Sequence, residues 1–481
     1  MIGVNKYVLF NGKELKLFCK KFNLIKFNNI NVRIDKIVID SRKVEKGSLF
    51  VAITGENNDG HRYIKQAMDI GAVCVICEKI PNDVDVNIYK DVCFIVVDNS
   101  VEALQNLARF QRSRLKSKVI GITGNIGKTT TREMIRTAIG SFFKTTTTEC
   151  NYNNHIGLPL TIVNTPIDTE ILILEMGMNH IGEIDFLTRI ARPDVAVITK
   201  IAPAHIGNFN NIGEIVKAKA EIFNGMGKNG TVILDGDGEF VEDFRNFANQ
   251  RGIKNIITVG SGDNNDVKIK KIGFCNDLTT NYEIFVNGVC VSGKINGLIK
   301  HNVFNSLFAF AVARVFNLDL VKVADNLENF QIVNGRGNFE RKNVNGKKIT
   351  IINDCYNSSP DSLSASINTL SEIKRLFGNS RCVAIIGDML ELGEKSKQYH
   401  SNIADVLISC EINNVVCIGE DCREIFKKLP NTFNKLDFKR TDDFCDKILD
   451  FVEDNDILLL KASHGMHFEK IIDTLSKENN D

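Results

Sequence analysis

The sequence has a net charge of only +1 and lacks any long hydrophobic run. Its 481 residues carry 60 Lys and Arg side chains against 59 Asp and Glu, so no overall field attracts nucleic acid or an anionic membrane. The most apolar stretch, residues 307–316, is short and contains Arg314. Residues 1–6 do not begin the apolar segment of a secretory signal. We therefore expect a cytoplasmic protein that binds neither nucleic acid nor a membrane.

The sequence also lacks an ordered cysteine framework. Its 13 cysteines are odd in number and scattered, and most of them lie in runs typical of strands, such as residues 72–77. The Cys-x-x-Cys pair of Cys74 and Cys77 has no second ligand pair at a spacing suited to zinc. We expect reduced thiols in the core, in preference to disulfides or a metal site.

The chain does contain a repeated alternation of short apolar runs and amphipathic stretches. Its length exceeds one ordinary core, and this alternation is typical of parallel sheets covered by helices. We therefore predict an α/β fold with three domains: a small α/β domain (1–112), a central phosphate-loop ATPase domain (113–328) and a C-terminal Rossmann-like domain (329–481). The expected strands are residues 37–39, 49–53, 73–76, 94–97, 119–123, 171–174, 195–199, 232–234, 349–352, 382–386, 415–418 and 457–460.

An insertion is expected within the central domain. Residues 267–295 contain several segments of period-two alternation around Asn287 and Gly288, a pair that favours a tight hairpin turn. A helical pattern follows over residues 302–315. The sequence therefore predicts a hairpin-like insertion that leads into a helix.

A glycine-rich loop stands where a strand is expected to run into a helix, and it reads Gly124-Asn125-Ile126-Gly127-Lys128-Thr129-Thr130. Gly124 and Gly127 permit a tight turn whose N–H groups point inward. Lys128 can reach the β- and γ-phosphates of a nucleotide, while Thr129 ligates Mg²⁺. The helix that follows directs its positive end at the anion. A chance turn would not need this flanking strand and helix, so we interpret the loop as an ATP site.

Two metal-capable residues follow the next expected strands. Glu175 comes directly after the strand at residues 171–174, and His205 follows the strand at residues 195–199. A Glu at the end of a strand is usually just solvated. Two such residues on strands of one sheet, at the edge that holds the phosphate loop, favour a metal site shared with Thr129.

Taken together, these motifs resemble the Mur ligase family, the enzymes that add amino acids to the UDP-linked precursor of peptidoglycan. Its Thr-Gly-x-x-Gly-Lys-Thr loop is matched at residues 123–129, and other elements of its second domain at residues 151–159 and 217–222. The resemblance covers nearly the whole chain. It implies ATP and Mg²⁺ as cofactors and a carbamylated Lys219 at the metal site, where the residues alone would indicate a solvated helix charge. The catalytic and metal-binding residues that it implies are Lys128, Thr129, Glu175, His205 and Lys219.

The outer domains narrow the substrates that the resemblance implies. Residues 40–61 resemble the UDP-sugar domain of the third- and fourth-step ligases of the family, with Ser41 and Arg42 on the substrate. Residues 354–362 and 387–394, with His400 beyond, resemble the ligase that adds a dipeptide. The resemblance thus implies an ATP-dependent ligase that joins D-alanyl-D-alanine to the terminal carboxylate of UDP-MurNAc-tripeptide through an acyl-phosphate. We expect these two small molecules as its partners and a monomeric protein.

Further contacts follow from the resemblance alone. It places Asn305 at the adenine, Arg336 at the phosphates and Asp354 at the ribose. The residues that it places at the other substrates are Asn153, Asn154, Tyr356 and Asn357. Each has an ordinary alternative, such as a helix-surface amide, a solvated loop charge or a turn former.

Two other functions stay open at this stage. The first keeps the chemistry and changes the acceptor to another amino acid or dipeptide. The second is a degenerate nucleotide-binding paralogue that acts as a scaffold. It is motivated by Lys200, Ala462 and His464, where the family usually has Asn, Gly and Arg. His464 in place of Arg removes a permanently charged guanidinium that can bind a carboxylate through two hydrogen bonds.

Overall fold

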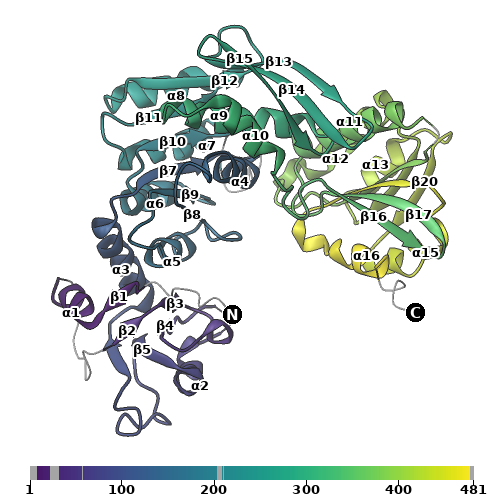
Figure 1. Cartoon of the computed structure of the whole chain (residues 1–481). Helices are drawn as coiled ribbons and strands as arrows, with labels where there is room; N and C mark the ends of the chain where they lie inside the picture. Colours follow the sequence, from purple (N-terminus) through teal and green to yellow (C-terminus); the bar gives the residue numbers. More distant parts are fainter. Residues whose placement is uncertain are drawn as a thin grey trace.

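The computed structural model describes residues 8–21, 32–56, 58–202, 209, 211–378 and 380–476. Within these ranges the strands form four sheets, of two, four, nine and six strands. Figure 1 shows the sheets spread along an open arc, with the N-terminal part at the lower left and the C-terminal part at the right. The expected α/β class, with a parallel central sheet and a separate sheet on either side, is confirmed.

The N-terminal part is a small parallel sheet in the order β3-β4-β5-β6. Its strands are β3 (Lys36–Val38), β4 (Ser48–Val51), β5 (Ala72–Cys77) and β6 (Cys93–Val96). Short strands β1 (Phe10–Asn11) and β2 (Arg33–Ile34) pair beside helix α1 (Gly12–Lys21). Helices α2 (Ile64–Ile70) and α3 (Ser100–Arg114) complete this part, and α3 leads toward the central sheet.

The central sheet has nine strands in the order β15-β14-β13-β12-β11-β10-β7-β9-β8. Apart from the edge strand β8, its parallel strands are largely apolar because helices cover both faces. These strands are β7 (Lys118–Thr123), β8 (Thr145–Thr147), β9 (Ile171–Glu175), β10 (Val195–Ile198), β11 (Thr231–Asp235) and β12 (Asn255–Gly260). The helices are α4 (Lys128–Ile139), α5 (Gly157–Val163), α6 (Glu183–Ala191), α7 (Ile212–Ala220), α8 (Val241–Gln250), α9 (Lys300–Val315) and α10 (Leu320–Glu328).

The predicted hairpin insertion is confirmed. Strands β13 (Val267–Phe274), β14 (Thr279–Val286) and β15 (Val289–Asn296) are antiparallel to one another, and Asn287 and Gly288 form the turn with positive φ angles of 54° and 83°. At the other end of β13 and β14, Phe274 and Leu278 pack against the core of the C-terminal part. The insertion therefore joins the central sheet to the last domain, as Figure 1 shows.

The C-terminal part is a six-stranded sheet in the order β16-β17-β21-β18-β19-β20. Only β16 runs antiparallel to its neighbour. The strands are β16 (Asn338–Val344), β17 (Lys347–Asn353), β18 (Cys382–Gly387), β19 (Asn414–Ile418), β20 (Asn434–Phe438) and β21 (Ile457–Lys461). The helices are α11 (Pro360–Leu376), α12 (Ser396–Ser409), α13 (Arg423–Lys428), α14 (Thr441–Cys445), α15 (Ile448–Phe451) and α16 (Glu469–Thr474).

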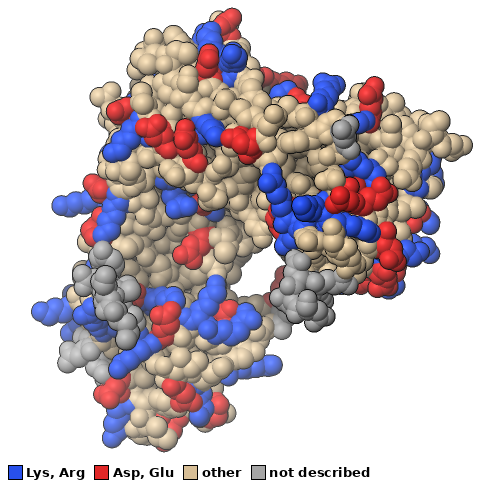
Figure 2. All heavy atoms as spheres, turned by 45° about the vertical axis from the view of Figure 1, so that its right-hand side comes forward, with Lys and Arg blue, Asp and Glu red and all other residues tan. Residues whose placement is uncertain are grey.

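The surface agrees with the balanced composition. Figure 2 shows Lys and Arg side chains interspersed with Asp and Glu on the visible face. Among the described residues there is no helix with the length and apolar character needed to cross a membrane. The cysteines are free thiols and most are buried, as the sequence predicted.

The side chain of Asn164 links the sheet of strands β3 to β6 to the central domain. Asn164, at the end of α5, accepts a hydrogen bond from the Ile37 N–H (2.9 Å) and donates one to the Ile37 carbonyl (2.9 Å). Ile37 lies on β3, which pairs with β4 on its other side. The Asn164 side chain therefore makes with Ile37 the pair of hydrogen bonds that a neighbouring strand would make.

We predict that Asn164→Ala exposes β3. Both Ile37 backbone groups lose a partner, which costs about 1–3 kcal/mol, so the Ile37 amide should exchange its hydrogen about ten- to a hundredfold faster. Asn326→Ala is a matched control, because Asn326 makes two hydrogen bonds inside the central domain, to Ala138 and Ser141 (both 2.8 Å). Unchanged exchange in Asn164→Ala, or equal acceleration in the control, would contradict the interpretation.

Candidate active site

A cavity of about 1130 Å³ lies between the central and C-terminal sheets. Its central wall is formed by the carboxyl ends of β10 and β11, the loop between β7 and α4, and the start of α9. Its other wall is formed by loops of the C-terminal part that follow β17, β18 and β21. Ligands of open α/β sheets collect at such strand ends.

The glycine-rich loop is confirmed as a tight turn between β7 and α4. Gly124 has a φ of 140°, and a Cβ atom there would lie 2.0 Å from the Thr199 Oγ1 atom. Gly127 has a φ of 87°, and a Cβ atom there would lie 2.7 Å from the Asn305 Oδ1 atom. Only glycine suits either position. Asn305 is thereby held against the loop, which fits its expected place at the nucleotide.

Two N–H groups of the loop are already bound within the protein. The N–H groups of Asn125 and Ile126 donate to the Lys200 carbonyl, at 3.0 and 3.2 Å. These two hydrogen bonds tie the loop to the segment that follows β10. No side chain caps the first turn of α4, which begins at Lys128 after Gly127. An anion would therefore be held by that first turn, through Lys128, Thr129 and Thr130.

Two cationic side chains reach the cavity beside this turn. The Lys128 ammonium donates to the carbonyls of Gly124 (2.9 Å) and Asn125 (3.2 Å). Desolvation lowers the pKa of Lys128, Arg336 adds to that effect and Glu175 opposes it. Arg336 stacks on the Tyr356 ring at 4.1 Å, and its buried Nε atom has no partner among the described residues. An unpaired buried donor beside a desolvated lysine suits a polyphosphate.

Glu175 is the centre of the buried polar network. Its carboxylate is 2% exposed and accepts hydrogen bonds from the Thr129 hydroxyl (3.0 Å), the Arg132 guanidinium (3.2 Å) and the Asn153 amide (2.9 Å). A hydroxyl and a carboxylate oxygen this close can supply two ligands of an oxygen-rich cation site. The two residues therefore fit a Mg²⁺ ion at the strand edge.

Lys219 is buried on α7, and the sequence-based picture of a solvated helix charge is wrong. The residue is 3% exposed. Desolvation lowers the pKa of Lys219 well below its ordinary value, Lys128 adds to this effect, and Glu175, Glu183 and Glu221 oppose it. This shift favours the neutral form of the amine, which is the form that reacts with electrophiles. The third expected metal ligand, His205, lies outside the described residues.

The C-terminal wall holds a second buried ion pair. The Lys461 ammonium lies 2.7 Å from the Asp354 carboxylate and donates to the Asn357 carbonyl at 3.0 Å. Asp354 also accepts a hydrogen bond from the Ser366 hydroxyl (2.6 Å). These contacts fix the loop after β17, so that Tyr356 and Asn357 face the cavity. Asp354, Tyr356 and Asn357 are thus brought together with the phosphate loop.

Other expected substrate residues lie apart from this cavity or have structural partners. Ser41 is buried in the first domain, where Arg42 makes a bidentate pair with Asp40. Asn154 accepts hydrogen bonds from the Ile156 and Gly157 N–H groups at the start of α5. Asn153 faces the cavity but holds Glu175. In this structure both asparagines therefore support the site's framework.

Three site residues were missed by sequence reasoning. Desolvation raises the pKa of Asp235, at the end of β11, to about 6. Desolvation also lowers the pKa of His301, at the start of α9, to about 4. Both face the cavity, and Arg132 pairs with Glu175 at 3.2 Å. Asp235 directly follows an expected strand, as Glu175 does, so the same rule could have found it. His301 and Arg132 carried no such signal.

Family models match three consecutive segments of the chain. The Mur ligase family catalytic domain matches residues 33–112, the Mur ligase middle domain residues 122–313, and the Mur ligase glutamate ligase domain residues 335–464. Among curated relatives, UDP-N-acetylmuramoyl-tripeptide–D-alanyl-D-alanine ligase of Bacillus subtilis (strain 168) is 33% identical, over 92% of this chain and 93% of its own. The enzyme of that name from Rickettsia prowazekii (strain Madrid E) is 31% identical, over 92% and 95%.

Solved structures agree with these matches over the full length. A crystal structure of MurF from Acinetobacter baumannii has a TM-score of 0.83 at 26% identity and covers 98% of this chain and 99% of its own. MurF ligase from Thermotoga maritima in complex with ADP has a TM-score of 0.76 at 27% identity, with coverage of 92% and 97%. The phosphate loop, the buried Glu175 network and the three matched domains agree in one conclusion: the chain belongs to the Mur ligase family and is most similar to its MurF members.

Proposed function

We propose that this chain is an ATP-dependent ligase that joins D-alanyl-D-alanine to UDP-MurNAc-tripeptide and so forms UDP-MurNAc-pentapeptide for peptidoglycan synthesis. The observation that carries the proposal is the single cavity in which the phosphate loop faces the Asp354–Asn357 loop. The two curated relatives carry the name of a ligase with this specificity, and this chain matches 93% and 95% of their lengths. The proposed ATP site and acceptor site would therefore lie in one cavity.

The chemistry requires an activated carboxylate, because forming a peptide bond in water is uphill. We propose that the terminal carboxylate of the tripeptide attacks the γ-phosphoryl group of ATP and gives an acyl-phosphate and ADP. Lys128, Arg336 and the first turn of α4 would stabilise the charge that passes to ADP. The dipeptide amine then attacks the acyl carbon and inorganic phosphate leaves. The protein's task is to align the reactants and exclude water.

Metal binding completes the proposed site. Thr129 and Glu175 would hold a Mg²⁺ ion, which supplies positive charge at the phosphates. His205 and a carbamylated Lys219 would hold a second ion. Burial of Lys219 and its lowered pKa support this modification, because a neutral amine is the form that takes up carbon dioxide.

The remaining features of the proposal concern organisation. We keep residues 1–112, 113–328 and 329–481 as the domain boundaries, with Ser41 and Arg42 at the UDP-linked substrate. Asn305 and Asp354 are proposed at the adenine and the ribose. A monomer is proposed because the domains of one chain already surround the cavity. A cytoplasmic location is proposed because all the reactants are soluble phosphates and peptides.

We predict that Lys128→Ala abolishes dipeptide-dependent ADP release. Removing the ammonium should lower kcat by at least about a hundredfold, because it acts on charge that develops at the phosphates. Binding of UDP-MurNAc-tripeptide, measured by calorimetry, should change little. Lys228→Ala, at an exposed lysine of the same domain, is the matched control.

The outcomes of this assay separate the alternatives. Unchanged turnover in Lys128→Ala would overturn the role of the phosphate loop. No ADP release by the natural chain with D-alanyl-D-alanine, but release with another amine, would change the acceptor. Nucleotide binding without turnover on tripeptides that end in diaminopimelate or lysine would favour a scaffold.

We also predict a carbamate on Lys219. In ¹³C-bicarbonate the natural protein should show a carbamate carbon signal by NMR, and Lys219→Arg should lose it, because a guanidinium does not react. Lys217→Arg, at an exposed position on the same helix, should keep the signal. A natural protein without the signal, or a signal that survives in Lys219→Arg, would refute the modification.

A further inference from the structure

The segment after β18 presents an exposed leucine to the cavity. Leu390, Glu391 and Leu392 line the C-terminal wall. Leu390 is 45% exposed, although it lies next to a buried methionine, Met389. Ligand cavities are lined largely by apolar side chains with a few polar groups that orient the ligand, so an exposed leucine in this wall is suited to cover an apolar part of a ligand. This feature points to an apolar contact with a substrate.

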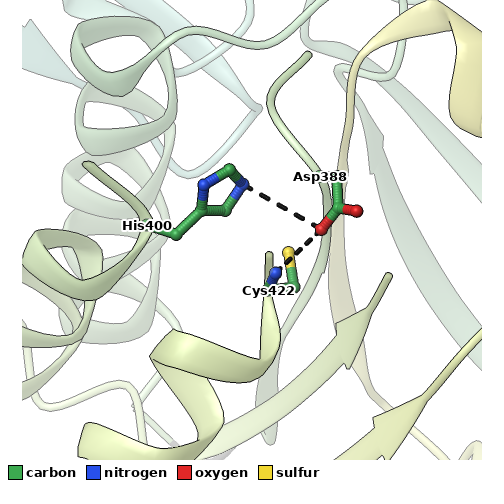
Figure 3. Close-up of side chains that lie close together, drawn as sticks. All are labelled: Asp388, His400 and Cys422. Carbon is green, nitrogen blue, oxygen red and sulfur yellow. Dashed lines mark hydrogen bonds and ion pairs between the residues drawn. The ribbon is translucent and has the colours of Figure 1, made fainter. Parts of the chain in front are cut away.

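Behind this segment lies a cluster of three potential metal ligands, drawn in Figure 3. Ligand atoms of Asp388, His400 and Cys422 lie within 4.8 Å of one another. Their hydrogen bonds, however, argue against a metal. His400 accepts the Met389 N–H at Nε2 (2.9 Å), while its Nδ1 lies 2.8 Å from the Ser396 carbonyl and donates to it. Both ring nitrogens are therefore in use, and the imidazole has one defined tautomer.

Asp388 and Cys422 are likewise committed to the protein. The two Asp388 oxygens accept the N–H groups of Cys422 (2.8 Å) and Glu420 (3.0 Å). Burial raises the pKa of the Cys422 thiol well above its ordinary value, so it stays protonated. Gly419 has a φ of 121°, and a Cβ atom there would lie 2.4 Å from the Asp388 carboxylate. The cluster therefore fastens the exit of β18 to the exit of β19.

This anchoring determines where Leu390 points. Its own N–H donates to the Ser463 hydroxyl at 2.9 Å, so successive amides at residues 389 and 390 are held by two different side chains. A Cβ atom on Gly465 would lie 2.9 Å from Leu390 Cδ1, so the side chain packs closely over that glycine. Nearby, the His464 and Tyr356 rings meet edge to face at 5.9 Å. Leu390 thus belongs to an apolar and aromatic rim across the cavity from the phosphate loop.

We propose that Leu390 is a specificity-determining residue that contacts the methyl side chains of the acceptor dipeptide, and that His400 is the positioning residue that holds it there. The inference rests on the proposed function and deepens it. D-alanyl-D-alanine offers two methyl groups as its only apolar surface, and a rim that faces the phosphate loop across the cavity would hold its amine toward the activated carboxylate. His400 touches no substrate; it acts through the Met389 amide.

The first test measures the acceptor KM in Leu390→Ala. Loss of this contact should raise the KM for D-alanyl-D-alanine roughly fivefold to tenfold, because the shorter alanine side chain leaves the dipeptide methyl groups in contact with water. The KM for ATP should stay constant. Leu436→Ala, at a leucine of the same domain that is 37% exposed on β20, is the matched control. An unchanged dipeptide KM in Leu390→Ala, in an active enzyme, would overturn the role of Leu390.

The second test addresses His400. His400→Leu removes the acceptor of the Met389 N–H and should raise the dipeptide KM. His400→Gln supplies a new acceptor and should keep the dipeptide KM close to that of the natural protein. Ser371→Ala also removes a buried hydrogen bond of this domain, to the Cys410 carbonyl (3.0 Å), and should lower Tm without raising that KM. A dipeptide KM that follows Tm in all three variants would reduce His400 to a folding role. An inactive natural chain would instead count against the proposed function.

Discussion

The site depends on one buried negative charge. Glu175 stands at the end of a strand that is apolar throughout, and its carboxylate is the acid that offsets the desolvated Lys128 and Lys219. The same two oxygens hold Thr129, Arg132 and Asn153 by hydrogen bonds. Because a buried charge needs partners, these contacts hold the phosphate loop, α4 and the loop before α5 at fixed positions. Without Glu175 the repulsion between Lys128 and Lys219 would be opposed only by weaker effects such as those of Glu183 and Glu221 on Lys219.

Much of the fold could be predicted because its strands are buried on both faces. The runs that become β7, β9, β10, β18 and β21 are apolar from end to end, and polar residues follow each of them. The strands that were missed include β8, β16 and β20, which all lie at sheet edges. An edge strand has one neighbour and polar residues, so its pattern resembles a loop. The central strand β12 was also missed, although its run of apolar residues could have been recognised as a strand.

The candidate site was predictable only in part, and the reason is tertiary. Lys128, Thr129 and Glu175 carry local signals, since a loop or a strand end identifies them. Lys219 does not, because its burial comes from packing against other elements and its sequence reads as an exposed helix face. Likewise the Lys200 carbonyl, which binds two N–H groups of the phosphate loop, acts through its backbone. Such a contact cannot be recognised from the residue type, because every residue has a backbone carbonyl.

The insertion has a consequence for how the domains are joined. Phe274 and Leu278 are partly buried and pack against the core of the last domain, and Lys300, at the start of α9, forms an ion pair with Glu372 on α11. These contacts fasten the central and C-terminal domains together on the side away from the first sheet, as Figure 1 shows. The insertion is therefore a strut that links the two domains forming the walls of the cavity. The first domain meets the central one elsewhere, through α3, which packs on α5, and through Asn164.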